Sequence, residues 1–199
     1  GPYNFQALVA DKEYRGLRAT IVTTEWIDAN YDGTRPDGGS DLQTKIRNFI
    51  IDAYTTWGTE YVLLGGDGDG PANPDEDIIP ARMLHVLTTD IPADMYYGCL
   101  DGTFDHDGDG IYGEPNDGPG GGEVDLFAEV QVGRAAVDSY EELSNFIRKT
   151  LEYENDYSPY LSDVWMAGEY LWPTTWGGDY KDEIKDGAST CGYTTTGFE

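Results

Sequence analysis

The chain has 199 residues, which is enough for one large domain with a substantial buried core. Its 38 acidic residues against 12 lysines and arginines give a formal net charge of −26, which argues against nucleic acid or an anionic membrane as a partner. No apolar run reaches the length of a membrane span, so we expect no membrane insertion, and two cysteines are too few for a disulfide framework. The acidic surface is typical of an extracellular or high-salt protein, and it favours calcium or basic ligands.

Helical and strand patterns alternate along the chain. Some segments carry apolar residues at helical spacing, and others are continuous apolar or β-branched runs. Within the helix that begins at Ser40, Arg47 and Asn48 are expected to face away from the core. The predicted elements, in chain order, are a helix over 4–16, a strand over 17–23, a helix capped by Ser40 and Gln43 and ended by Gly58, strands over 61–64, 83–87, 95–100 and 126–132, a helix capped by Ser139 and Glu142, a strand over 164–167 and a short helix over 180–185.

The run Tyr61–Leu64 is continuously apolar, as is typical of a strand buried on both faces of a parallel sheet. Together with the alternation of helices and strands, it predicts the α/β class with a mainly parallel sheet. In such sheets functional residues gather beyond the carboxyl ends of the strands. The candidate strand ends are Gly65–Asp67, Gly133-Arg134 and Gly168-Glu169.

The segment Gly65–Gly70 has the glycine spacing of a phosphate-binding loop, but its chemistry argues against one. Asp67 and Asp69 would repel an anion, and prolines follow where the N-terminus of a helix is needed. The segment is therefore interpreted as a turn, with Asp67 as a residue that borders a cleft.

Residues 104–117 form a strongly acidic loop. Three of its aspartates have the x, x+2, x+4 spacing of a calcium loop, and Gly110 stands where the chain must turn sharply. The loop is not an EF-hand, because Asn116 occupies the place of the final glutamate and no helices bracket it. The alternative to a calcium site is a solvated turn. The candidate ligands are Asp105, Asp107, Asp109, the carbonyl oxygen of Ile111, and Glu114.

Nucleophilic chemistry has little support within the chain. The only histidines are His85, on a predicted buried strand, and His106, inside the acidic loop. A cysteine nucleophile needs a base within hydrogen-bond reach, and neither histidine is placed for that. Cys99 and Cys191 are therefore interpreted as small, partly buried thiols.

Taken together, the segments resemble, in order, the amino-terminal part of the catalytic region of gingipain-type cysteine peptidases. The resemblance covers about 130 residues, and its specificity comes from the order and spacing of the segments. These are Lys45–Ile50, Trp57-Gly58, Tyr61–Asp67, Ile79–Arg82, Asp94–Gly102, Asp107–Glu114, Glu129–Arg134 and Tyr153-Glu154.

The resemblance implies a caspase-like three-layer α/β/α sandwich of two subdomains, here residues 1–161 and the truncated start of a second at 162–199. It also implies endopeptidase activity, a secreted or cell-surface location, and bound calcium. The family's Gly-His-Gly and the apolar strand that delivers the nucleophilic cysteine are missing, so both are expected beyond this chain. Glu169 corresponds to the acid that orients the catalytic histidine, although a solvent-facing glutamate in a turn is the alternative.

Two functions of different classes remain open at this point. The favoured one is a fragment of a secreted cysteine endopeptidase, inactive alone, whose partners are a protein or peptide substrate and the remainder of its own catalytic region. The alternative is a non-catalytic, calcium-stabilised surface module with a peptidase-like fold. A flavodoxin-like nucleotide binder is disfavoured by the acidic charge.

Overall fold

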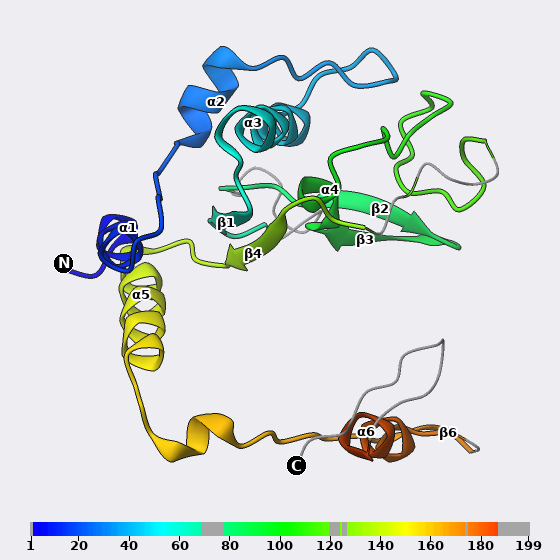
Figure 1. Ribbon diagram of the computed structural model, residues 1–199. Coiled ribbons are helices and arrows are strands. Elements are labelled where there is room, and N and C mark those ends of the chain that lie inside the picture. Colours follow the sequence, from blue (N-terminus) through cyan, green and yellow to red (C-terminus); the bar gives the residue numbers. More distant parts are fainter. Residues whose placement is uncertain (1, 69–77, 120–123, 125–126, 174, 187–199) are drawn as a thin grey trace. The chain divides into compact units, whose positions relative to one another are not determined.

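The computed structural model describes residues 2–68, 78–119, 124, 127–173 and 175–186 (Figure 1). The chain forms two compact units, Gly1–Asn155 and Asp156–Glu199. The predicted functional boundary between residues 161 and 162 stays a prediction, because compactness alone does not define a functional subdomain. Among the described residues, no helix is long and apolar enough to cross a membrane.

The first unit opens with helix α1, Phe5–Tyr14, which Asn4 caps by accepting a hydrogen bond from the Ala7 amide (3.0 Å). The helix predicted over residues 4–16 is therefore confirmed. The strand predicted over residues 17–23 is wrong, since this segment is in no ladder within the described chain. β-Branched residues favour a strand only where a neighbouring strand is available for pairing.

Helix α2, Thr24–Asn30, follows where the sequence pattern predicted no helix. The hydroxyl of Thr23, the last residue of the expected strand, accepts a hydrogen bond from the Trp26 amide (3.3 Å). A threonine read as a strand former thus acts as a helix cap, which is the other context that this residue type favours.

Helix α3, Leu42–Trp57, confirms the helix predicted after Ser40. Its cap is one residue later than predicted, because the Asp41 side chain accepts the hydrogen bond from the Thr44 amide (2.8 Å). Gly58 ends the helix in the left-handed conformation (φ 66°), as its position predicted.

The expected outward orientation of Arg47 and Asn48 is wrong for Arg47, which is buried. Asn48 is half-buried and donates to the Asp32 carbonyl oxygen (2.7 Å). Arg47 shares the inner face of α3 with Ile50, three positions later, which is the spacing of neighbours on one helix face. Arg47 therefore lies on the buried face of α3 and not on the outward face that the sequence pattern predicted.

Strand β1, Tyr61–Gly65, pairs in parallel with β4, Gln131–Ala135. Strand β4 lies later than the predicted range 126–132 and includes Arg134 instead of ending before it. Leu64 is buried but Leu63 is exposed, so the prediction that β1 is buried on both faces is wrong among the described residues.

Strand β2, Arg82–Val86, confirms the strand predicted over 83–87 and pairs with β3, Thr89–Ala93, in an antiparallel hairpin. The strand predicted over 95–100 is wrong, because this segment begins with helix α4, Met95–Gly98. Successive residues in α4 are buried instead of alternating between two faces, as a short helical turn inside a core allows.

The described strands form three two-stranded sheets, and only β1 and β4 pair in parallel. The molecule therefore mixes helices and strands around a small parallel sheet, compatible with the α/β class, while a mainly parallel sheet is not seen among these residues. Because β1 and β4 run in the same direction, the chain between them must form a crossover connection.

Helix α5, Tyr140–Glu154, confirms the capping signal at Ser139, whose hydroxyl accepts a hydrogen bond from the Glu142 amide (3.3 Å). It packs against α1 within the first unit, where Lys12 of α1 pairs with Glu154. Ile147 supplies its fully buried apolar contact.

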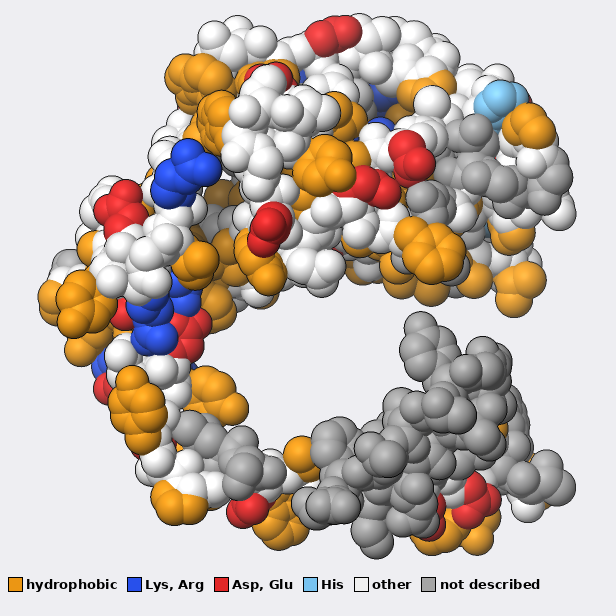
Figure 2. All heavy atoms as spheres, in the orientation of Figure 1, with side chains coloured by type: hydrophobic (Ala, Val, Ile, Leu, Met, Phe, Trp, Pro, Cys, Tyr) orange, Lys and Arg blue, Asp and Glu red, His pale blue; other side chains and the backbone are white. Residues whose placement is uncertain are grey.

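The core of the first unit joins α3, α4, β1 and the acidic loop. Figure 2 shows that hydrophobic side chains also appear on the visible surface, interspersed with acidic ones. The buried cluster consists of Ile27, Ile46, Ile50, Leu64, Ile79, Tyr96, Tyr97, Cys99, Phe104, Tyr112 and Val130.

In the second unit the strand predicted over 164–167 is wrong, because these residues are exposed and in no ladder within the described chain. The helix predicted over 180–185 is confirmed within a longer helix. The elements of this unit are a 3₁₀ helix over Pro159–Ser162, the antiparallel strands β5, Tyr170–Trp172, and β6, Thr175–Trp176, and α6, Gly177–Asp186.

Candidate functional site

The acidic loop brings three of its predicted ligands together. One carboxylate oxygen from each of Asp105, Asp107 and Asp109 lies within 4.8 Å of the other two. Asp105 is 0% exposed, whereas the other two aspartates are exposed. A hydrogen bond from the Gly113 amide to the Phe104 carbonyl oxygen (2.8 Å) closes the loop at its base.

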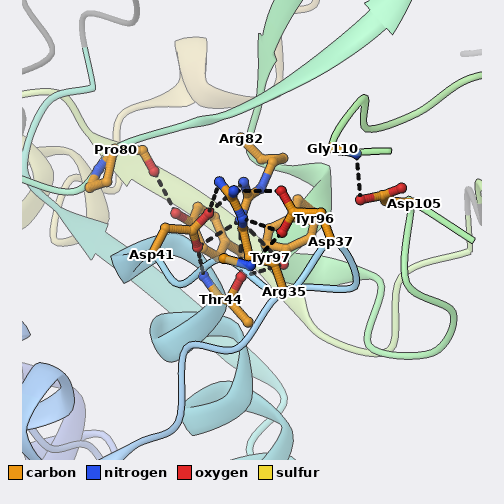
Figure 3. A network of polar contacts seen from close by, with 11 residues as sticks. Arg35, Asp37, Asp41, Thr44, Pro80, Arg82, Tyr96, Tyr97, Asp105 and Gly110 are labelled. Carbon is orange, nitrogen blue, oxygen red and sulfur yellow. Dashed lines mark hydrogen bonds and ion pairs between the residues drawn. The ribbon is translucent and has the colours of Figure 1, made fainter. Parts of the chain in front are cut away.

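The carboxylates of this cluster shape the loop through main-chain hydrogen bonds. Asp105 accepts from the amides of Asp109 (3.1 Å) and Gly110 (3.2 Å), the second of which is drawn in Figure 3. Asp107 accepts from the Asp109 amide (3.2 Å), and Asp109 accepts from the Ile111 amide (2.8 Å). Each carboxylate retains further lone pairs, so the cluster offers hard oxygen ligands.

Three glycines in the acidic loop adopt positive φ: Gly108 at 73°, Gly110 at 86° and Gly113 at 86°. A side chain at Gly108 would come within 3.1 Å of the Pro36 carbonyl oxygen, and one at Gly110 within 3.1 Å of an Asp37 carboxylate oxygen. The prediction of a sharp turn at Gly110 is therefore confirmed, and the loop lies against the segment that precedes α3.

Two predicted ligands have a less direct place in the cluster. Ile111 uses its amide within the loop, and its side chain is exposed. Glu114 is half-buried and its carbonyl oxygen accepts from the Asp117 amide (3.2 Å), while its carboxylate is not one of the three clustered groups. Metal-ligand roles for both stay predictions.

Asp117, which the sequence analysis left outside the ligand set, is buried and has a shaping role. Its carboxylate accepts hydrogen bonds from the amides of His106 and Gly118. The signal for this role was present in the sequence, since an aspartate next to glycine favours such local side-chain to backbone bonds.

Beside the acidic loop lies a buried arrangement that the sequence analysis missed. We call it the arginine–aromatic column. Its members are Arg47 of α3, Arg82 of β2, Tyr96 of α4, and Phe104 and Tyr112 of the acidic loop.

Arg82 is the member that binds a carboxylate. Its guanidinium donates two hydrogen bonds to Asp41 (2.9 and 3.0 Å) and one to the Thr44 hydroxyl (3.1 Å), as Figure 3 shows. Its Cζ lies 4.0 Å from the ring centroid of Tyr112 and 4.5 Å from that of Tyr96. Burial opposes ionisation of Asp41, but the hydrogen bonds and charge of Arg82 outweigh it and lower the pKa of this carboxyl.

Arg47 binds main-chain carbonyl oxygens in place of a carboxylate. It donates to those of Tyr96 (2.9 Å), Cys99 (2.8 Å), Asp101 (2.9 Å) and Gly102 (3.1 Å). Burial lowers the pKa of its guanidinium despite these neighbours. One side chain on α3 thus fixes the segment that leads from α4 into the acidic loop.

The predicted strand end Gly133-Arg134 lies within β4, and Arg134 reaches from there to the end of β1. Its guanidinium forms a bidentate pair with Asp94 (2.8 and 2.6 Å) and donates to the carbonyl oxygens of Gly66 (2.9 Å) and Ile79 (2.7 Å). Burial acts to lower the pKa of Arg134, and the stronger combined influence of Asp94 raises it. Arg134 therefore links β4 to the segments that contain Gly66, Ile79 and Asp94.

Asp67 lies directly after β1, where the sequence analysis placed it. Its amide donates to the Val137 carbonyl oxygen (3.2 Å), and its carbonyl oxygen accepts from the Ile79 amide (3.1 Å). These bonds make Asp67 a junction between the ends of the two parallel strands. Asp69 lies outside the described residues.

Glu169, the predicted catalytic acid, belongs to the second unit and is exposed. It stands directly before β5 instead of after a strand, and its carbonyl oxygen accepts from the Gly177 amide (2.7 Å). Its role in orienting a histidine stays a prediction.

The cysteines and histidines have separate surroundings. Cys99 is fully buried at the end of α4. His85 lies on β2 beside Asp90 (2.9 Å) and the Leu87 carbonyl oxygen (3.2 Å), and the hydrogen bond to Asp90 raises the pKa of its imidazole. His106 lies in the acidic loop, and Cys191 lies outside the described residues.

A family model described as peptidase family C25, the gingipain family, matches residues 3–196. The match spans nearly the whole chain and includes every segment on which the resemblance in the sequence was based. None of the curated proteins and none of the solved structures compared with the chain gives a significant match.

Proposed function

The chain belongs to peptidase family C25, and from this premise we propose that it is part of a gingipain-like secreted cysteine endopeptidase. The observation that carries the proposal is the family match over residues 3–196. The substrate class that follows from the family is a protein or peptide. A secreted or cell-surface location is supported by the net charge of −26, which suits an extracellular setting.

For the fold of the assembled enzyme we propose a caspase-like three-layer α/β/α sandwich. The parallel pairing of β1 with β4 supports it, since parallel strands are normally covered by helices on both faces. The exposure of Leu63 on β1 is consistent with a sheet that gains further cover in the longer protein.

For catalysis we propose that the nucleophilic cysteine and its histidine lie outside residues 1–199. The surroundings of Cys99 and His85 support this, because one is sealed in the core and the other is engaged with Asp90. A thiolate nucleophile needs access to substrate and a base within hydrogen-bond reach.

Glu169 is proposed to accept a hydrogen bond from the Nδ1–H of that histidine. A carboxylate in this position holds the imidazole in one tautomer and stabilises the imidazolium that forms when the thiol is deprotonated. Its exposure in the second unit leaves it accessible to a histidine supplied by the remainder of the catalytic region.

The test compares residues 1–199 with the longer protein on unstructured peptide substrates, with and without a thiol-alkylating reagent. We expect thiol-dependent cleavage by the longer protein and none by residues 1–199. In the longer protein, Glu169→Gln should lower kcat by orders of magnitude, as loss of the histidine-orienting acid does in related triads. A longer protein without any cleavage activity would instead favour the calcium-stabilised, non-catalytic module.

For the acidic loop we propose a structural calcium ion. The fit rests on two observations: the clustered carboxylates and the complete burial of Asp105. Hard carboxylate and carbonyl oxygens are the ligands that calcium prefers. When bound, the ion supplies charge neutralisation, and the residues that would hold it are Asp105, Asp107, Asp109, Ile111 through its carbonyl, and Glu114.

A further inference from the structure

A pocket of about 190 Å³ lies in the first unit between the start of α3, strand β2 and the acidic loop. A cavity of roughly 150 Å³ already holds a benzene-sized group, so this pocket has room for one side chain of a ligand. We call it the Gln43 pocket, and none of the roles described above uses it. Its lining includes Arg35, Gln43, Arg82, Met83, Asp90 and Ile111.

The Gln43 pocket has an exposed rim and a buried floor. Asp90 and Ile111 are exposed at the rim, whereas Arg82 and Tyr112 at the floor are 5% and 4% exposed. Met83 is half-buried and, with Ile111, gives the pocket an apolar wall. A group that enters loses water on its apolar sides, so the few polar groups of the lining decide what is accepted.

The charged groups of the pocket already have partners. The Arg82 guanidinium holds Asp41 through two hydrogen bonds. Arg35 donates to Asp37 (3.0 Å), and this pair is also drawn in Figure 3. The carboxylate of Asp90 lies 2.9 Å from an imidazole nitrogen on β2. A charged ligand would therefore lose its hydration without meeting an unpaired opposite charge, which favours a neutral ligand.

Gln43 is the neutral polar side chain of the lining, and it is not engaged elsewhere. The sequence pattern assigned it to a capping box with Ser40, but the side chain of Asp41 caps α3 instead. The side-chain amide of Gln43 takes part in no hydrogen bond among the described residues. Two N–H donors and one acceptor oxygen therefore remain free at the pocket.

A primary carboxamide is the ligand group that best matches the amide of Gln43. Its oxygen and one of its N–H bonds lie on the same side, so two such groups can exchange a pair of hydrogen bonds. A trans peptide group holds its N–H and C=O on opposite sides and can make only one of these bonds at a time. The apolar wall formed by Met83 and Ile111 suits the methylenes of a glutamine side chain.

Two donors at the floor also favour an occupant with an acceptor oxygen. The Tyr112 hydroxyl and the Nε–H of Arg82 are buried and have no hydrogen-bond partner among the described residues. A buried donor without an acceptor destabilises a fold. Both atoms are closed to solvent here, so a ligand oxygen would reach them only after a small movement of the floor. Their contribution is secondary to that of Gln43.

We propose that the Gln43 pocket binds the side-chain carboxamide of a glutamine carried by a polypeptide. Gln43 exchanges two hydrogen bonds with the ligand amide, and Met83 and Ile111 pack against the ligand methylenes. A polypeptide is the source because the substrate class proposed above is a protein or peptide, and in this respect alone the inference rests on the proposed function. Binding needs none of the groups proposed for catalysis, since the lining residues all belong to the first unit.

The experiment titrates residues 1–199 with N-acetyl-glutamine-methylamide and follows ¹H–¹⁵N NMR spectra. We expect saturable shifts at the amides of Gly110 and Ile111 and at the side-chain NH₂ of Gln43. The glutamate and methionine counterparts of the probe have nearly the same length but carry a carboxylate or a thioether. We expect both to bind at least about five-fold more weakly, because neither can exchange the pair of hydrogen bonds.

A variant with a matched control tests the role of the side chain. Gln43→Met keeps the length and the helix propensity of the residue and removes the amide, so we expect it to weaken binding of the glutamine probe about five-fold or more. Gln6→Met makes the same change on the exposed surface of α1 and should leave the dissociation constant unchanged. The spectra themselves show whether each variant is folded.

The outcomes separate this inference from the proposed function. Equal binding of the glutamine and glutamate probes, unchanged binding by folded Gln43→Met, or no saturable shifts at all would overturn the carboxamide site. Tighter binding of free glutamine than of the blocked probe would overturn a polypeptide as the source. Each of these results leaves the peptidase proposal standing, because the titration involves no cleavage. A longer protein that cleaves nothing but still binds the glutamine probe would instead remove the peptidase proposal and keep the pocket.

Discussion

The acidic loop and the arginine–aromatic column share residues, but the loop is held by hydrogen bonds between residues close in sequence and the column by hydrogen bonds between residues far apart in sequence. In the loop, Asp105 accepts hydrogen bonds from amides only four and five positions away. In the column, Arg82 binds Asp41 at a separation of 41 positions, and Arg47 reaches the Cys99 carbonyl oxygen across 52. The comparison teaches that the loop can be shaped by its own sequence, whereas the column exists only after the chain has folded.

The largest expected effect is on the column. Arg82→Met leaves the half-buried Asp41 without its bidentate partner, so we expect the free energy of unfolding to fall by about 3–5 kcal/mol in urea denaturation. Arg148→Met, which breaks an exposed pair with Glu152, is the control and should cost at most about 1 kcal/mol. Equal losses in the two variants would remove the distinction between column and surface.

The next effect concerns the loop. Calcium at 100 times its dissociation constant should raise the free energy of unfolding by about 2.7 kcal/mol, because the ion binds the folded state alone. In the double variant Asp107→Ala and Asp109→Ala we expect no such increase, since two of the three clustered carboxylates are gone. Thermal melts with calcium and with a chelator measure the difference, and an identical calcium response in both proteins would exclude the cation site.

A smaller effect joins the column to pH. The pKa of Asp41 is lowered in the folded state, so its pairing with Arg82 stabilises the fold above the unfolded pKa of about 3.9 and is lost as pH falls through the folded value. We expect unfolding free energies measured between pH 6 and pH 3 to fall toward acid pH, and less steeply in Asp41→Asn. The same slope in both proteins would show that other carboxyl groups account for acid unfolding.

The smallest effect concerns the contact between His85 and Asp90 in the β2–β3 hairpin. The hydrogen bond to Asp90 raises the pKa of His85, so Asp90→Asn should lower it toward about 6.5. Because the folded pKa is raised, the pair favours folding below the unfolded pKa and that contribution disappears as pH rises through the folded value. Imidazole chemical shifts in an NMR titration report the pKa directly, and an unchanged midpoint would mean that Asp90 does not interact with the imidazolium.

Local signals predicted the parts of this structure that depend on neighbouring residues. The glycine at the end of α3, the serine that caps α5 and the spacing of the clustered aspartates all act within a few positions. The family resemblance was likewise read from ordered local segments, and the family match confirms it.

The errors arose where a residue's partner is distant in sequence. Residues 17–23 have the composition of a strand, yet pairing depends on a neighbour that composition does not reveal. Arg47 was expected to face away from the core, because nothing near it in sequence indicates the carbonyl oxygens that accept its hydrogen bonds. The segment 95–100 was predicted as a strand, but it begins with helix α4, in which Tyr96 and Tyr97 are both buried.

Phe104 illustrates how two demands meet at one position. Its φ of 63° lies in the region that glycine prefers, and a bulky residue there costs roughly 1–3 kcal/mol. Glycine would relax the main chain but empty a fully buried niche, while any other side chain keeps the backbone cost and alters the fit. No residue satisfies both the backbone conformation and the filling of the buried niche. Position 104 should therefore tolerate very little variation during evolution or protein engineering.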